Sequence, residues 1–273
     1  MKFHICSDFH LDYNQGDFAG EEPNRFLLDD CYNLIAGDLS GYDTIRQEWL
    51  SKQIAAGKIG AFVLGNHDCI YQTNPNKLTY PQMVDKVMEE FGNTPLVFLN
   101  NTYVYFPDED IVLWGATFWT DFKYGYKGNA SINGYWAEHG MNDFRFELWP
   151  REDGEGLRCS RWEDFAALHD KSLESLTKCI EEHPHSRFVV LTHHAPSRQS
   201  IDSNYINSDL NAAYVSDLEG YILEHPQIKL WVHGHIHSHS RYKIGECEVI
   251  ANPFGYRRYY EDVGYIPDLI VEV

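Results

Sequence analysis

Short apolar segments recur along the chain, and each ends in a polar or glycine-containing turn. Several are rich in Val, Ile and Leu without strict alternation of polar and apolar positions, which is typical of strands buried on both faces. The pattern predicts nine strands: Lys2–Ser7, Tyr32–Ala36, Gly60–Leu64, Leu96–Leu99, Thr102–Phe106, Ile111–Ala116, Phe188–Thr192, Lys229–Val232 and Glu246–Ala251.

Helical patterns lie between these strands. The longest is predicted at Trp162–Glu182, where apolar residues at three-to-five-residue spacing form one stripe and Pro184 ends the helix. Three further helices are predicted: Thr44–Ala56 after a capping Asp43, Tyr80–Phe91 with Pro81 in its first turn, and Asp209–Leu223. Alternating strands and helices indicate an α/β layered fold.

Residues Thr120–Arg161 carry six glycines and many aromatic residues but show no clean period. We interpret them as a cap or insertion over one end of the sheet, because they lack an apolar stripe of their own. The organisation expected for residues 1–273 is therefore a single domain with an insertion at about 120–161.

Composition narrows the function classes. The chain has 273 residues, 22 Lys and Arg against 41 Asp and Glu, and a formal charge of −19. This balance argues against stable binding of DNA or RNA. No apolar run reaches the roughly 18–20 residues that a membrane helix needs.

The six cysteines are scattered without a C-x-x-C pair, and the first residues lack the apolar stretch of a signal peptide. We expect reduced thiols and a cytoplasmic protein.

Five short motifs follow predicted strands, and each of them contains His, Asp or Asn. They are Asp8-Phe9-His10, Gly37-Asp38, Gly65-Asn66-His67-Asp68, His193-His194 and Gly234-His235-Ile236-His237. In an open α/β sheet, ligands bind at the carboxyl ends of the strands, so these side chains are expected to converge.

The donor atoms favour metal binding. Imidazole and carboxylate together suit manganese, iron, zinc or nickel, and the motif set offers no thiolate ligand. The candidates number seven, which is too many for one tetrahedral ion but suits two ions with a carboxylate between them: Asp8, His10, Asp38, Asn66, His193, His235 and His237.

In their order and spacing, these motifs resemble those of the calcineurin-like metallophosphoesterases. The resemblance extends from Asp8 to His237 and so spans nearly the whole chain. It implies a four-layer α/β/β/α sandwich of two mixed sheets flanked by helices. It also implies a metal-dependent phosphoesterase with two divalent ions.

Carried over by position, the resemblance assigns a role to each motif residue. Asp8, His10 and His237 would hold one ion, while Asn66, His193 and His235 would hold the other. Asp38 would bridge the two ions.

Asn66 and His67 would also face the substrate phosphate. A metal-bridging hydroxide would attack the phosphorus, and His67 would protonate the leaving oxygen as general acid.

Two positions leave alternatives open. Ser/Thr protein phosphatases of this superfamily carry G-D-x-V-D-R-G, whereas here Gly41 stands where the second Asp would be. The partner that orients His67 would then be Asp43 or Asp68, and Asp68 is taken as a second catalytic residue. Of the doublet His193-His194 we favour His193 as the ligand, because it directly follows the strand.

The remaining motifs receive plainer interpretations. His169 and four other histidines are expected to be solvated. Residues 252–256 could return a loop toward the site and bring Arg257 and Arg258 with them, but we favour a surface loop.

The expected activity is hydrolysis of a phosphomonoester or phosphodiester, with a small nucleotide-like substrate favoured over a polymer by the negative charge. A phosphoprotein phosphatase is one alternative, which Gly41 disfavours. A non-catalytic scaffold is another, but all seven ligand positions and His67 are filled. A nuclease would be expected to show a basic groove.

Overall fold

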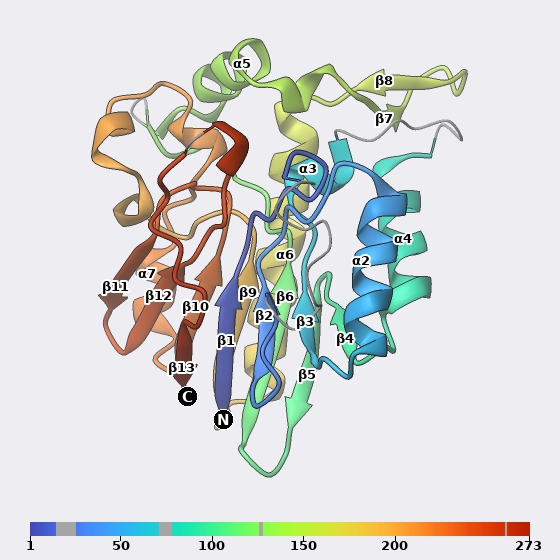
Figure 1. Ribbon diagram of the computed structural model, residues 1–273. Helices are drawn as coiled ribbons and strands as arrows, with labels where there is room; N and C mark the ends of the chain where they lie inside the picture. Colours follow the sequence, from blue (N-terminus) through green and yellow to red (C-terminus); the bar gives the residue numbers. More distant parts are fainter. Residues whose placement is uncertain (15–25, 71–77, 126–127, 260) are drawn as a thin grey trace.

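The computed structural model describes residues 1–14, 26–70, 78–125, 128–259 and 261–273 (Figure 1). Its first sheet has five strands in the order β13-β1-β2-β3-β4. Four of them are parallel, and β13 runs antiparallel to β1 at the edge. The strands are β1 (Lys2–Cys6), β2 (Tyr32–Ile35), β3 (Gly60–Phe62), β4 (Leu96–Phe98) and β13 (Ile270–Glu272).

The second sheet has six strands in the order β11-β12-β10-β9-β6-β5. Its four central strands are parallel, and each edge strand is antiparallel to its neighbour. The strands are β5 (Thr102–Phe106), β6 (Ile111–Ala116), β9 (Arg187–Thr192), β10 (Ile228–His233), β11 (Ser240–Ile244) and β12 (Cys247–Ala251).

Helices cover the outer face of each sheet. Helices α2 (Asp43–Ala55) and α4 (Tyr80–Phe91) pack on the first sheet, and α6 (Trp162–Glu182) and α7 (Glu219–Glu224) pack on the second. A third apolar cluster fills the space between the sheets, where Phe3, Ile5 and Leu34 meet Val189 and Leu230. The predicted four-layer α/β/β/α sandwich is confirmed.

The carboxyl ends of the parallel strands meet at one edge of the molecule, the upper edge in Figure 1. Residues of the predicted insertion lie over this edge. They form α5 (Ala130–Gly140) and the hairpin of β7 (Glu147–Pro150) and β8 (Leu157–Cys159). Residues 126–127 of the insertion lie outside the described residues.

The insertion shares the core of the first sheet. Ala137, Phe144 and Leu148 belong to the same buried cluster as Phe62 of β3 and Phe165 of α6. This packing agrees with a cap on a single domain, although the division into domains stays a prediction. None of the helices in the described residues is long and apolar enough to cross a membrane.

The predicted helix Asp209–Leu223 is wrong. Only Asn211–Ala213, a 3-10 turn, and α7 are helical there. The backbone N–H groups of Ser216 and Leu218 donate instead to the carbonyl oxygens of Ala195 and Pro196. These long-range hydrogen bonds replace the helical ones and tie the segment to the loop after β9.

Several elements were not predicted. They are α3 (Asn66–Ile70), α5, β7, β8, β11, β13 and four more 3-10 turns at Asn142–Arg145, Arg198–Ser200, Ser203–Tyr205 and Arg257–Tyr259. Asp43 is the first residue of α2 and not its cap. Its carboxylate pairs with Arg46 and Lys86.

The close approach of the two sheets predicts a stability effect at Gly115 of β6. A Cβ atom there would lie 2.8 Å from Leu99 Cβ and 3.1 Å from Val63 Cγ1. We expect Gly115→Ala to lower the free energy of unfolding by about 1–3 kcal/mol through overpacking. Urea unfolding of protein stripped of metal by a chelator measures this free energy. The control is Gly220→Ala in α7, where nothing lies within 4 Å; equal stabilities of the two variants would contradict this account of the sheet contact.

Candidate metal centre

The motif residues lie where the strands end, and their backbone is unusual. Asp8, His10, Asp38 and His235 all have positive φ, between 42° and 65°, although none is a glycine. Such conformations cost free energy, and four of the eight non-glycine residues that adopt them in the described residues are motif residues. Each turns its side chain toward the edge that the two sheets share.

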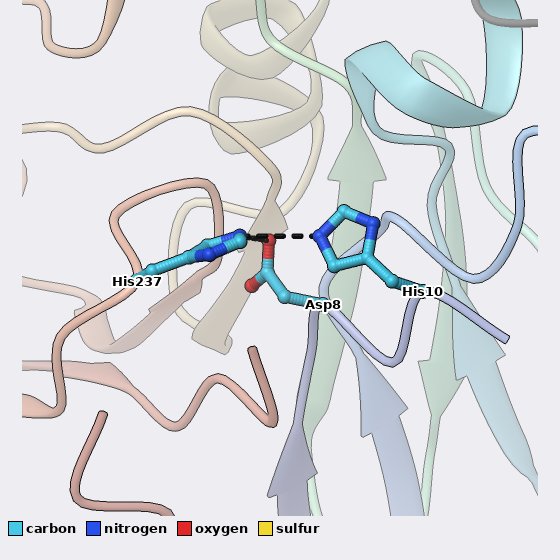
Figure 2. Close-up of side chains that lie close together, drawn as sticks. All are labelled: Asp8, His10 and His237. Atoms are coloured by element: carbon cyan, nitrogen blue, oxygen red, sulfur yellow. Dashed lines mark hydrogen bonds and ion pairs between the residues drawn. The ribbon is translucent and has the colours of Figure 1, made fainter. Parts of the chain in front are cut away.

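One group consists of Asp8, His10 and His237, whose nitrogen and oxygen ligand atoms all lie within 4.8 Å of one another. Figure 2 shows these side chains pointing toward one another from the turn after β1 and the loop after β10. His10 Nε2 lies 3.1 Å from His237 Nε2, and His237 Nε2 lies 3.4 Å from Asp8 Oδ1.

A second group consists of Asp38, His193 and His235. Asp38 Oδ2 lies 3.4 Å from His193 Nε2 and 3.8 Å from His10 Nε2, so this one carboxylate oxygen lies near members of both groups. Asn66 Oδ1 lies 2.9 Å from His193 Nε2 and adds a further oxygen. The structure therefore brings all seven predicted ligand residues together.

Glycines make this convergence possible. A Cβ atom on Gly37 would lie 2.5 Å from His193 Nδ1, and one on Gly234 would lie 2.7 Å from Asp8 Oδ2. A Cβ atom on Gly65 would overlap Asp38 Oδ1. Glycine is therefore needed in the Gly-Asp, Gly-Asn and Gly-His dipeptides because a side chain would not fit there, and not only because glycine favours turns.

Charge in the centre is balanced between buried acids and histidines. Burial opposes ionisation of Asp38, but His193, together with His67 and His10, outweighs it and holds the pKa of Asp38 well below its usual range. Burial likewise opposes the charge on His193, yet Asp38 raises the pKa of His193 to about 9. Against the same effect of burial, Asp8 raises the pKa of His237 to about 10.

Two other histidines lack this compensation. Burial lowers the pKa of His10 to about 3 and that of His235 well below its usual range. Both are neutral imidazoles, the form that binds metals. Within the described residues, the buried His235 Nε2 has no hydrogen-bond partner.

These properties fit divalent cations. Two buried carboxylates, four imidazoles and an amide oxygen suit manganese, iron, zinc or nickel. In the protein without metal, protons on His193 and His237 balance the charge of the two carboxylates. Bound cations would replace those protons. The buried His235 Nε2 would gain a partner.

His67 lies beside both groups. Its backbone N–H donates to Asp38 Oδ1 at 2.9 Å, and its ring centroid lies 4.7 Å from that of His10. The His67 side chain is half-buried, whereas Asn66 and Asp68 on either side are buried. His67 therefore keeps access to the outside of the centre.

Asp68 holds two motif turns together. Its carboxylate accepts hydrogen bonds from the backbone N–H groups of Leu39, Ser40 and Gly65 and lies 3.6 Å from Arg46 Nη1. These contacts favour a structural role for Asp68, and its predicted role as the partner that orients His67 stays a prediction.

His193 and His194 point to different surroundings. His193 Nδ1 bonds the carbonyl oxygen of Ala36, which leaves Nε2 facing Asp38 and Asn66. The His194 ring packs against Trp119, with its Nδ1 3.3 Å from the carbonyl oxygen of Thr117.

Three polar residues around the centre were not predicted to belong to it. Asp143 of the insertion accepts a hydrogen bond from Asn66 Nδ2 at 3.2 Å, and burial raises the pKa of Asp143 to about 7. Glu261 Oε2 lies 2.9 Å from His237 Nδ1. Tyr256 stacks on the His10 ring at 4.2 Å between centroids. Asp143 lies on the short 3-10 turn Asn142–Arg145, and Tyr256 and Glu261 lie outside the helices and strands, so no periodicity or motif spacing marks any of them.

Two of the plainer interpretations are wrong. Residues 252–256 return to the centre and do not form a surface loop, although the Arg257 guanidinium lies over the Phe254 ring and not at the ligands. His169 is buried in α6, where its Nδ1 bonds the carbonyl oxygen of Trp119.

Comparison with known proteins identifies the class. The family model described as calcineurin-like phosphoesterase matches residues 1–239. The chain belongs to this family, whose members use two divalent metal ions, and it is a metal-dependent phosphoesterase. No curated protein sequence matches the chain.

One solved structure supports the fold. Phosphopantetheinyl hydrolase (PptH) from Mycobacterium tuberculosis is similar with a TM-score of 0.72 and 14% identity, over 95% of this chain and 91% of that one. A putative 5'-nucleotidase from Staphylococcus aureus, solved in complex with alpha-ketoglutarate, gives a TM-score of 0.48 and 14% identity. That match covers 100% of this chain and 54% of the other. At 14% identity the likeness to PptH concerns the fold alone.

The geometry predicts different outcomes for the neighbouring histidines. His193→Ala should lower the metal content after dialysis, because a nitrogen facing Asp38 is lost. His194→Asn should retain it, because the amide can still bond Thr117. Elemental analysis of both purified variants provides the test, and the opposite ranking would move the ligand to His194.

Proposed function

We propose that the centre holds two divalent ions and hydrolyses phosphomonoesters or phosphodiesters of small, nucleotide-like molecules. The first ion would be held by Asp8, His10 and His237. The observation that carries this proposal is the position of Asp38 Oδ2, near ligands of both groups.

Asn66, His193 and His235 would hold the second ion, with Asp38 between the two. When bound, the ions would supply the Lewis acidity that activates a water molecule and neutralises the phosphoryl oxygens. The chain itself contributes the fixed ligand geometry, because Asp143 and Glu261 hold Asn66 and His237 in orientation.

His67 is the proposed general acid. It lies next to the ligands but is half-buried, so a substrate at the ions would be within its reach. Together with Asn66 it would face the phosphate and give a proton to the leaving oxygen. For Asp68, we propose that it positions His67 indirectly by holding the second and third motif turns together.

A small substrate is favoured by charge. A formal charge of −19 repels a long polyanion, whereas two divalent ions offset it only locally. Gly41 argues against a phosphoprotein phosphatase, and the complete set of motif residues argues against a non-catalytic scaffold. The six cysteines are all free and fit a reducing compartment, so we propose the cytoplasm.

The proposal predicts metal-dependent hydrolysis. Chelator-stripped protein should be inactive toward bis(p-nitrophenyl) phosphate and p-nitrophenyl phosphate, and manganese, nickel or zinc should restore cleavage of at least one. The preferred ester separates a diesterase from a monoesterase. Two bound ions without cleavage of either ester or of a nucleotide panel would contradict the proposed activity.

The role of His67 gives a separate prediction. His67→Ala should lower kcat for phenyl phosphate, whose leaving oxygen needs a proton, by about 100-fold to 10,000-fold, the usual contribution of a general acid, while metal content stays near normal. His139→Ala is the matched control, since His139 is an exposed histidine of α5. Loss of both ions from the His67 variant would instead make that residue a ligand.

A further inference from the structure

The loop after β12 is fastened to the turn that carries the first motif. Phe254 N–H donates to Ser7 O at 2.9 Å, and Gly255 N–H donates to Asp8 O at 3.0 Å. The Asn14 side-chain amide bridges the two segments by donating to Gly255 O at 2.8 Å. This loop lies beyond residues 1–239, the part that the family model matches.

Glu261 holds the tip of the loop. Its Oε2 accepts the backbone N–H of Tyr256 at 2.7 Å and lies 2.9 Å from His237 Nδ1. Gly255 has a φ of +73°, and a Cβ atom there would lie 2.7 Å from Glu261 Oε2, so glycine is required for the contact. The backbone of Tyr256 is thereby tied to a metal-ligand histidine.

The Tyr256 side chain contacts three histidines of the centre. Its ring stacks on His10 at 4.2 Å with an interplanar angle of 25°, and its centroid lies 4.8 Å from that of His237. Its hydroxyl lies 3.1 Å from His67 Nε2. His67 Nδ1 is a buried atom, and Nε2 is the ring nitrogen that faces the Tyr256 hydroxyl.

We propose that Tyr256 is a further catalytic residue, whose hydroxyl shares with His67 Nε2 the site of the leaving oxygen. This inference rests on the proposed role of His67 as general acid. Packing on His10 needs only the aromatic ring, whereas the hydroxyl lies at the one nitrogen that would deliver the proton.

The step balances without a further reactant. Water forms the new bond to phosphorus and releases one proton to solvent, from which His67 is protonated again after the step. The bond from phosphorus to the leaving oxygen breaks with its electron pair on that oxygen. The proton of His67 Nε2 passes to the leaving oxygen. Tyr256 keeps its own proton and donates a hydrogen bond to the same oxygen, which stabilises the charge that develops there.

The decisive comparison is between esters with poor and good leaving groups. Tyr256→Phe keeps the stacked ring and removes only the hydroxyl. We expect kcat for phenyl phosphate to fall about tenfold, because a phenolate of high pKa needs this stabilisation. For p-nitrophenyl phosphate the fall should be less than about twofold, since its leaving group needs little protonation. Metal content should not change.

Two controls separate this role from a structural one. Tyr259→Phe makes the same change at an exposed residue of the loop and should leave both rates unchanged. In a His67→Ala background, adding Tyr256→Phe should still lower kcat for phenyl phosphate by at least about tenfold, because the hydroxyl acts on the leaving oxygen itself and not through His67. Equal losses for both esters, no loss at all, or no further loss in the His67→Ala background would overturn the proposal.

A readout independent of turnover keeps this proposal distinct from the proposed function. In zinc-loaded protein, the ¹⁵N resonance of His67 Nε2 should shift in Tyr256→Phe and not in Tyr259→Phe. An unshifted resonance would overturn the contact itself. Inactive wild-type protein with a shifted resonance would overturn the proposed catalysis, and with it the catalytic role of Tyr256, while leaving the contact intact.

Discussion

The centre depends on one buried carboxylate. Asp38 is 1% exposed, and its Oδ2 lies between His10, on the turn after β1, and His193, at the end of β9. These residues come from different sheets, so the contact joins the two halves of the sandwich at their carboxyl ends. A buried anion without partners is costly, and here histidines, a backbone N–H and, in this family, metal ions compensate it.

The surrounding backbone accepts strain to keep that arrangement. Left-handed conformations at Asp8, Asp38 and His235 and the absence of a side chain at Gly37 and Gly65 bring ligand atoms within reach. The free-energy cost of these conformations is offset by the burial of three clusters of apolar residues beneath the site. Stability and site geometry are thus provided by different parts of the same fold, the strands and their terminal turns.

Much of this was predictable because parallel strands place their carboxyl ends together. The strand boundaries led directly to Asp8, Asp38 and His193, and the family motifs supplied their order. Asp143, Glu261 and Tyr256 were not predicted as part of the site, because they reach it from a single 3-10 turn and from a loop, neither of which carries a periodic pattern. The helix expected at Asp209–Leu223 failed for a related reason, since long-range backbone hydrogen bonds override local propensity.

The most direct test of the central claim is the electron paramagnetic resonance spectrum of the protein reconstituted with Mn²⁺, measured together with its metal content. A carboxylate shared by two ions predicts two Mn²⁺ per chain and the spectrum of an exchange-coupled pair. A single ion per chain, or two ions with the spectrum of isolated Mn²⁺, would contradict the assignment of Asp38 as the bridging residue.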